Sequence, residues 1–264
     1  MSVLSDEAPN LRAMLDELVA GTISDFGPVE MWDATVLDTF HSEALKATLS
    51  TARRSAFFKE KYSCLEFEPS VENWESLPFV EPRELKNKLN ELLTCRWSYI
   101  AQVNMSSGTT GGPTTYVAFT QDDLNNDGSF YAAKGLFRFD QTELVFVALP
   151  YDMATVGFAI HNDIRRQGAA VLPAGKGGTY SSPERLLGAI HDLRPRTLFS
   201  TPSYAYYLGE LYRQSWPGEQ MSIEEVRVGG EGASPAFIKL ISSIWGAKVS
   251  QWYGSTEAGP IAYS

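Results

Sequence analysis

Residues 143–149 read Glu-Leu-Val-Phe-Val-Ala-Leu, an apolar run that is bounded by Pro150. A short run that is apolar at almost every position is typical of a strand buried on both faces. Both faces are covered mainly in α/β proteins, in which helices pack on each side of a parallel sheet. The run therefore predicts a central strand of such a sheet.

Strand and helix patterns alternate outward from this run. Before it, Thr120 reads as the N-cap of a helix that continues to about Arg138. Serine followed by proline predicts two later helix starts, at Ser182 and Ser234. Strands are expected at 115–119, 143–149, 169–172, 196–200, 225–228 and 248–252, and further helices at 155–167, 183–193, 202–214 and 235–245. This alternation predicts an α/β fold with mostly parallel sheets and flanking helices.

The first hundred residues show a different pattern. Helical spacing of apolar residues occurs at 11–18, 35–62 and 84–93, and the segment 77–82 (Leu-Pro-Phe-Val-Glu-Pro) breaks it. The sequence thus predicts a mainly helical N-terminal segment at 1–100. An α/β part is expected at 101–264.

Composition narrows the class of partner. The 264 residues are 44% hydrophobic and 20% charged, as in ordinary globular proteins, and their formal net charge is −10. Such an acidic chain argues against nucleic acid or an anionic membrane as a main partner. Cys64 and Cys95 form no CxxC pair, and His41, His161 and His191 lack metal-ligand spacing. With no transmembrane run and an acidic N-terminus, we expect a cytoplasmic protein.

Residues 106–114 form a loop rich in hydroxyls and glycine, Ser-Ser-Gly-Thr-Thr-Gly-Gly-Pro-Thr. Glycines let successive backbone N–H groups turn inward, and the hydroxyls add donors, as a phosphate cradle requires. A Walker A loop is excluded, because no lysine follows the glycines and a strand, not a helix, comes next. A flexible linker has the same composition, so the residues alone leave both interpretations open.

Four further segments lie where the predicted strands end. In an open α/β sheet, ligands bind outside the carboxyl ends of the strands. These segments are rich in glycine, hydroxyls, aromatic rings and carboxylates, as a nucleotide site requires, although turns, caps and packed rings use the same residues. They are 150–152, 201–204, 229–232 and 253–257.

Taken together, these segments resemble the adenylate-forming enzymes, the superfamily of acyl-CoA ligases, luciferases and peptide-synthetase adenylation domains. Residues 107–113 resemble its phosphate loop, and 253–257 (Tyr-Gly-Ser-Thr-Glu) resemble its Tyr-Gly-x-Thr/Ser-Glu motif. Phenylacetate-CoA ligases are the nearest likeness within it. That likeness rests on Leu77-Pro78-Phe79, Ser106-Ser107, Thr114 and Thr201-Pro202-Ser203-Tyr204.

The resemblance implies a site for each part of the reaction. Thr256 would contact the α-phosphate of ATP, and Glu257 would ligate Mg²⁺. The implied phosphate contacts are Ser106, Ser107, Gly108, Thr109, Thr110 and Gly111. The implied adenine contacts are Gly230, Glu231, Gly232, Trp252, Tyr253 and Gly254, with Trp252 equally readable as a core ring. The implied acyl pocket consists of Tyr151, Thr155, Gly157, Phe158, His161, Tyr204 and Ser255.

By the same resemblance, the chain activates an aromatic carboxylic acid with ATP and then forms a thioester with coenzyme A. Aryl-acid catabolism and antibiotic biosynthesis both suit this chemistry. Gly112 stands where phenylacetate-CoA ligases commonly carry lysine, and the family's small C-terminal domain with its catalytic lysine is expected to be absent. A non-catalytic nucleotide- or acyl-binding relative is the alternative. The oligomeric state stays open, a homodimer included.

Overall fold

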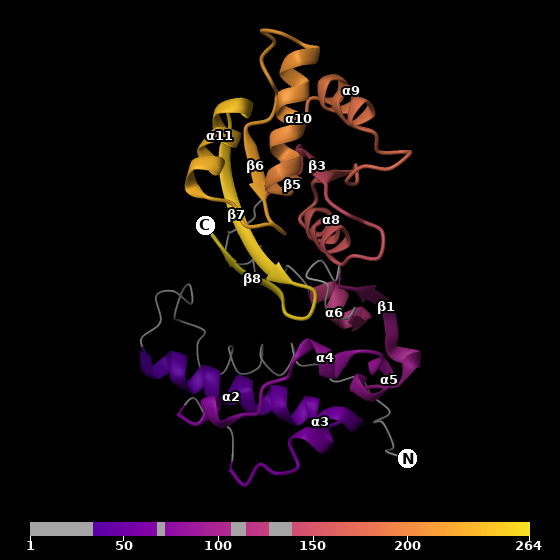
Figure 1. Cartoon of the computed structure of the whole chain (residues 1–264), viewed down its shortest axis with the longest axis vertical. Helices are drawn as coiled ribbons and strands as arrows, with labels where there is room; N and C mark the ends of the chain where they lie inside the picture. Colours follow the sequence, from indigo (N-terminus) through magenta and orange to yellow (C-terminus); the bar gives the residue numbers. More distant parts are fainter. Residues whose placement is uncertain (1–33, 68–71, 107–114, 127–138) are drawn as a thin grey trace. The chain divides into compact units, whose positions relative to one another are not determined.

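The computed structural model describes residues 34–67, 72–106, 115–126 and 139–264. The chain divides into two compact units, Met1–Asn126 and Asp127–Ser264, whose elements are labelled in Figure 1. The sequence places its boundary after residue 100 instead. Residues 101–126 are therefore the segment that the two divisions assign differently.

The described part of the first unit contains short helices and a two-stranded ribbon. The helices are α2 (Ala34–Ala52), α3 (Ala56–Lys61), α4 (Pro82–Leu85), α5 (Leu89–Leu92) and α6 (Gln121–Asn126), with 3-10 turns η2 (Trp74–Ser76) and η3 (Trp97–Tyr99). The strands are β1 (Ile100–Met105) and β2 (Tyr116–Thr120). They pair antiparallel, with Met105 opposite Tyr116 at the end that faces the 106–115 segment.

Two helices predicted in this unit were wrong as single helices, because each is divided into two in the structure. The expected helix 35–62 is split at Ser55, whose Oγ accepts the Phe58 N–H at 3.1 Å and caps a new helix. The expected helix 84–93 is split at Asn87, whose φ of 59° is left-handed and ends helical geometry. Local hydrogen bonding and backbone conformation thus override the apolar spacing at both places.

The cap at Thr120 is confirmed. Its hydroxyl accepts the Asp123 N–H at 3.1 Å, and the Asp123 carboxylate accepts the Thr120 N–H at 2.8 Å. This reciprocal pair satisfies N–H groups that have no partner within the helix. α6 therefore begins directly after β2, as the sequence predicts, and residues 127–138 of that prediction lie outside the described ones.

The second unit contains a six-stranded sheet in the order β4-β3-β5-β6-β7-β8. Its strands are β3 (Leu144–Ala148), β4 (Ala170–Pro173), β5 (Thr197–Ser200), β6 (Glu225–Val228), β7 (Lys248–Ser255) and β8 (Gly259–Tyr263). The first five in that order pair parallel, and β8 pairs antiparallel with β7. The mostly parallel sheet expected from the strand–helix alternation is confirmed, with β3 in its interior.

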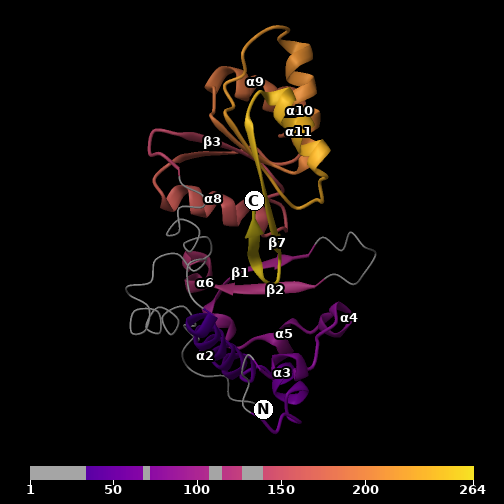
Figure 2. The same ribbon diagram turned by 90° about the vertical axis from the view of Figure 1, so that its left-hand side faces the viewer.

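Helices cover both faces of this sheet. They are α8 (Val156–Arg166), α9 (Pro183–Leu193), α10 (Pro202–Ser215) and α11 (Pro235–Trp245). One apolar cluster joins the sheet to α9, α10 and α11, and a second joins its other face to α8. Figure 2 shows α8 apart from the other three helices. β3, in the interior of the sheet, has helices packed on both faces, which explains its unbroken apolar sequence.

α10 and α11 approach each other unusually closely at Gly209. A Cβ there would lie 2.4 Å from Ile244 Cγ2 and 2.8 Å from Trp245 Nε1. Since Gly209 has no side chain, the Trp245 indole lies against α10, and its N–H donates to the Ala205 carbonyl at 2.9 Å. This hydrogen bond satisfies the buried indole N–H. This contact fixes α10, the helix that follows β5, against α11.

The end of β7 differs from its prediction. The strand was expected at 248–252, but it continues to Ser255 because β8 pairs with its second half, Trp252 lying opposite Tyr263. β8 itself was not predicted. An antiparallel partner satisfies backbone groups that would otherwise end the strand.

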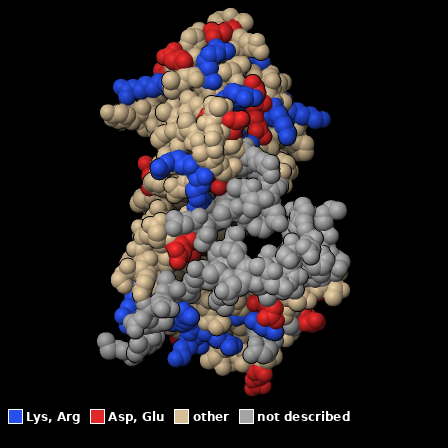
Figure 3. Space-filling view, turned by 180° about the vertical axis from the view of Figure 1, so that it is seen from behind, with Lys and Arg blue, Asp and Glu red and all other residues tan. Residues whose placement is uncertain are grey.

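Charged side chains are mixed on the surface. On the face seen in Figure 3, described acidic and basic residues lie interspersed. Among the described residues, no helix has the length and apolar character that crossing a membrane requires.

Candidate functional site

The second unit brings four of the predicted segments to one edge of its sheet. Because β3, β5, β6 and β7 run parallel, the segments after them all lie at the carboxyl edge. The loop after β4, residues 174–182, joins them there. This edge carries the candidate site, and its side chains are described from β3 across to β7.

An aromatic group stands at the end of β3. The Tyr151 ring meets Phe158 edge-on, with centroids 5.4 Å apart, and meets His161 at 6.0 Å. The Tyr151 hydroxyl and His161 Nδ1 are 3.4 Å apart, a long hydrogen bond. Burial raises the pKa of the Tyr151 phenol well above its usual value. Burial, with Arg165 nearby, lowers the pKa of His161. Both groups are therefore neutral at pH 7, and the surface is apolar with two polar tips.

Gly157 lets α8 start directly behind this group. Its N–H donates to the Pro150 carbonyl at 3.1 Å, and a Cβ there would lie 2.4 Å from the same oxygen. Thr155 precedes α8, and its Oγ1 is buried with no hydrogen-bond partner among the described residues. The predicted residues Tyr151, Thr155, Gly157, Phe158 and His161 thus lie together in the structure.

Glu231, after β6, is held by residues from two other segments of the edge. Its Oε1 lies 2.9 Å from Lys176 Nζ, and its Oε2 accepts the Ser203 hydroxyl at 2.6 Å. Burial raises the pKa of Glu231, but the hydrogen bonds from Ser203 and Lys176 outweigh it and bring the pKa to about 2. The carboxylate is therefore ionised throughout the physiological range.

Tyr204 lies beside this group, one residue along α10. Lys176 Nζ is 6.0 Å from its ring centroid, and the Tyr207 ring stacks on it with centroids 6.1 Å apart. Burial raises the pKa of Tyr204. Its predicted neighbours in an acyl pocket come from the adjacent strand connection, because β3 pairs directly with β5, the strand that precedes α10. Tyr151 follows β3, and Phe158 lies on α8.

Trp252 and Tyr253 on β7 face opposite sides, as successive residues of a strand do. The Trp252 ring packs on the cluster that includes Phe199, and a Cβ on Gly229 would lie 2.2 Å from it. This packing is that of a core ring. The Tyr253 side chain is 64% exposed, so its ring is accessible. Gly230 has a φ of 78°, a left-handed conformation that glycine adopts easily.

Thr256 and Glu257 lie in the turn between β7 and β8. Ser255 Oγ accepts the Ala258 N–H at 3.0 Å and closes this turn, and Glu257 is exposed. No group of three or more His, Cys, Asp or Glu in the described ranges is placed to hold a metal ion. A single exposed carboxylate fits Mg²⁺ that arrives on phosphate oxygens, since Mg²⁺ keeps most of its ligands as phosphate and water.

Ser106 belongs to the other unit, at the base of the glycine-rich loop. Its N–H donates to the Thr115 carbonyl at 2.9 Å, and its Oγ accepts the Thr115 N–H at 3.1 Å. These bonds close the loop at its neck. The other predicted phosphate contacts, Ser107, Gly108, Thr109, Thr110 and Gly111, lie outside the described residues.

Comparison with known proteins then decides the family. Residues 31–264 match the family described as AMP-binding enzyme, which is most of the chain. This chain is an AMP-binding family member.

Its curated relatives in the AMP-binding family include two phenylacetate-coenzyme A ligases. The protein from Thermus thermophilus is 30% identical over 190 residues, which cover 71% of this chain and 42% of the relative. The protein from Aromatoleum evansii is 29% identical over 164 residues, covering 61% and 36%. The chain thus spans less than half the length of these curated relatives.

A solved structure shares the AMP-binding fold. The 2-hydroxyisobutyryl-CoA ligase in an open conformation, with 2-HIB-AMP and CoA, superposes with a TM-score of 0.75 at 21% identity. The match covers 84% of this chain and 51% of that one. The predicted fold, that of an adenylate-forming enzyme core, is confirmed.

Lys176 was missed by the sequence reasoning. It stands among Gly175, Gly177 and Gly178 in the loop after β4, and no motif marks a lysine there. A charged residue flanked by glycines shortly after a strand is the signal that could have found it, since such a loop lies at the ligand-binding edge.

Proposed function

We propose that this chain is the ATP-binding part of an adenylate-forming ligase that activates an aromatic carboxylic acid and transfers it to coenzyme A. The observation that carries the aromatic specificity is the group of Tyr151, Phe158 and His161 at the end of β3. Edge-on rings beside an aryl substrate bind it by packing and offset stacking. The relatedness to two phenylacetate-coenzyme A ligases supports the same class of acid.

The proposed reaction has two steps. An oxygen of the substrate carboxylate attacks the α-phosphorus of ATP, the bond to the β-phosphate oxygen breaks, and pyrophosphate leaves. The thiol sulfur of coenzyme A then attacks the acyl carbon, its proton is lost, and AMP leaves. Both steps bring anions together, so positioning and stabilisation of charge are what the protein contributes.

Each of the predicted segments has a part in this proposal. The backbone at Gly230 and Gly232 and the exposed ring of Tyr253 would line the adenine, with Gly254 beside it. Thr256 would donate to the α-phosphate, and Glu257 would bind the Mg²⁺ that accompanies ATP. Ser106 and the loop that follows it would hold the β- and γ-phosphates. Tyr204 and Ser255 would complete the acyl pocket.

The neutral pair of Tyr151 and His161 would orient the acid. A half-buried neutral phenol can donate a hydrogen bond to a substrate carboxylate without adding charge. A catabolic role and a role in antibiotic biosynthesis differ in the acid that is used, so the identity of the substrate acid would distinguish the two roles.

Carboxylate-dependent exchange of labelled pyrophosphate into ATP tests the proposal on the full native protein, across aryl and aliphatic acids. We expect exchange with at least one aryl acid, and release of AMP only when coenzyme A is added as well. Exchange with no acid would contradict the ligase and favour the non-catalytic binding protein. Exchange with short aliphatic acids alone would contradict the aromatic specificity.

A further inference from the structure

Three segments at the carboxyl edge of the sheet meet at one carboxylate. Lys176 comes from the loop after β4, Ser203 from the start of α10 after β5, and Glu231 from the loop after β6. Glu231 Oε2 also accepts the Ser203 backbone N–H at 3.3 Å. That N–H belongs to the first turn of α10 and has no partner within the helix. Glu231 thus caps α10 from a distant loop.

The loop after β4 is folded to present Lys176. Gly175, Gly177 and Gly178 have φ values of 74°, 81° and 100°, conformations that other residues avoid. The Ala174 and Gly175 N–H groups both donate to the Val147 carbonyl, which ties the loop to the end of β3. The lysine therefore starts from a fixed backbone, and its ammonium is directed to Glu231.

The charge pair is only partly screened by water. The side chains of Lys176 and Glu231 are 29% and 36% exposed. An exposed ion pair alone stabilises a protein little. Here one carboxylate also accepts two hydrogen bonds at a helix N-terminus, where negative charge is favoured. The group acts as a network, so loss of the lysine is expected to loosen the other contacts.

We propose that Lys176 is a positioning residue, which holds Glu231 and through it the 229–232 segment and the start of α10. This role rests on the proposed function, in which the first segment lines the adenine and Tyr204 on α10 lines the acyl pocket. The ion pair would hold the adenine-lining segment and the acyl pocket in fixed positions relative to each other. Lys176 would then affect substrate binding without touching the reacting atoms.

Hydrogen–deuterium exchange tests the positioning without any assay of activity. Lys176→Met removes the charge at similar length, Glu231→Gln removes it from the other side, and Lys176→Arg keeps it. Lys239→Met changes an exposed lysine on α11 and serves as the control. We expect the amides of 201–205 and 229–233 to exchange about tenfold faster in the first two variants, because a charge-assisted contact is lost. Lys176→Arg and Lys239→Met should exchange as the wild type does.

Unchanged exchange in both segments would overturn the inference. Faster exchange spread evenly over the sheet would also overturn it, since Lys176 would then serve general stability. A melting temperature measured on each variant distinguishes local loosening of the two segments from a general loss of stability, since only the general loss lowers it strongly.

Steady-state kinetics on the full native protein test the link to the site. Lys176→Met should raise the KM for ATP about tenfold and lower kcat much less, because a binding segment is displaced while the reacting groups stay. An active wild type with an unchanged KM in the variant would overturn the inference. A wild type inactive with every acid, but with faster exchange confined to the two segments, would contradict the proposed function and leave the positioning role intact.

Discussion

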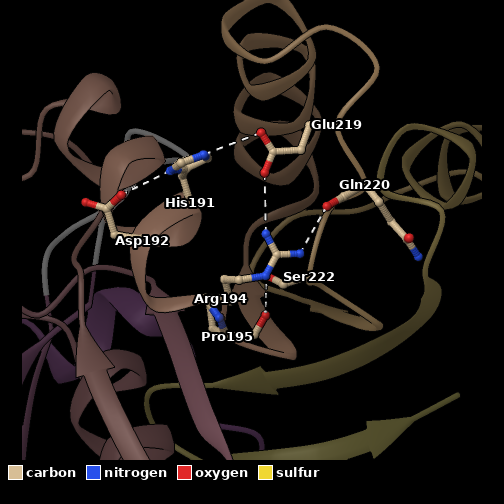
Figure 4. Close-up of polar contacts among 7 residues, drawn as sticks. All are labelled: His191, Asp192, Arg194, Pro195, Glu219, Gln220 and Ser222. Atoms are coloured by element: carbon tan, nitrogen blue, oxygen red, sulfur yellow. Dashed lines mark hydrogen bonds and ion pairs between the residues drawn. The ribbon is translucent and has the colours of Figure 1, made fainter.

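The imidazole of His191 lies flat against the indole of Trp216, with ring centroids 4.5 Å apart and ring planes 11° apart. His191 lies in the last turn of α9, and Trp216 directly follows α10. Nδ1 of His191 is 3.0 Å from Asp192 Oδ1, and Nε2 of His191 is 3.4 Å from Glu219 Oε2. Figure 4 shows Glu219 between His191 and Arg194, which donates to it at 3.4 Å. The stack thus joins α9 to the segment that precedes β6.

This arrangement predicts a stability that depends on pH. The hydrogen bond to Asp192, together with the nearby Glu219, raises the pKa of His191. The stabilisation is therefore fully present below the ordinary histidine pKa of about 6.5 and is lost as the pH rises through the higher folded value. A protonated imidazole also binds the face of an indole more strongly. The difference in melting temperature between wild type and His191→Gln should be largest near pH 5.5 and shrink toward pH 8.

His41→Gln is the control, because that histidine is exposed on α2. Its melting temperature should follow the wild type at every pH. A difference for His191→Gln that stays constant, or that grows with pH, would contradict the prediction.

Gly229 is expected to tolerate no side chain. A methyl group there would lie 2.2 Å from the Trp252 ring, which cannot move without disturbing the cluster around Phe199. We expect Gly229→Ala to lower the free energy of unfolding by about 1–3 kcal/mol, the usual cost of overpacking. Urea denaturation measures it.

The matched substitution is Gly188→Ala in α9. Nothing lies within 4 Å of a Cβ there, and alanine is the better helix former. This variant should be more stable than wild type by about 0.5–1 kcal/mol. Equal effects of the two substitutions would show that packing against Trp252 is not the cause.

The parallel sheet was predictable because each of its strands carries a strong local signal. Residues 144–149 are apolar throughout, and β3 is buried at every position after Leu144, as that pattern requires. Ser182 and Ser234 precede proline, and both predicted helix starts are confirmed. These patterns can be recognised from neighbouring residues alone, without information on contacts to distant parts of the chain.

The features that were missed depend on partners far along the chain. β8 forms because β7 offers it an edge, and Lys176 matters because Glu231, 55 residues later, lies beside it. The breaks at Ser55 and Asn87 are decided by single side chains and dihedral angles, which apolar spacing does not register. In the candidate site, the aromatic group was predicted as a set, but its contacts were not.

Phe158 is expected to govern affinity for the acid. Its ring is 37% exposed and packs edge-on to Tyr151, so it offers a free face to an aryl group. Phe158→Ala should raise the KM for the aryl acid about tenfold, the cost of losing an aromatic contact. The KM for ATP should stay unchanged.

Leu240 is an apolar residue of similar exposure on α11, and Leu240→Ala should change neither KM. A parallel rise of both KM values in Phe158→Ala would point to a general disturbance of the fold. An unchanged KM for the acid would remove Phe158 from the pocket.

Glu257 is expected to set the requirement for magnesium. It is exposed in the β7–β8 turn, in a sequence that the strand pairing holds in place, and its carboxylate is the kind of oxygen ligand that Mg²⁺ prefers. Glu257→Gln keeps the shape but removes the charge. The Mg²⁺ concentration for half-maximal exchange activity should rise about tenfold, since a charged ligand contact is lost. Glu210→Gln on α10 should leave it unchanged. If both variants have the magnesium dependence of the wild type, the ion is held by phosphate and water alone, and Glu257 has no metal role.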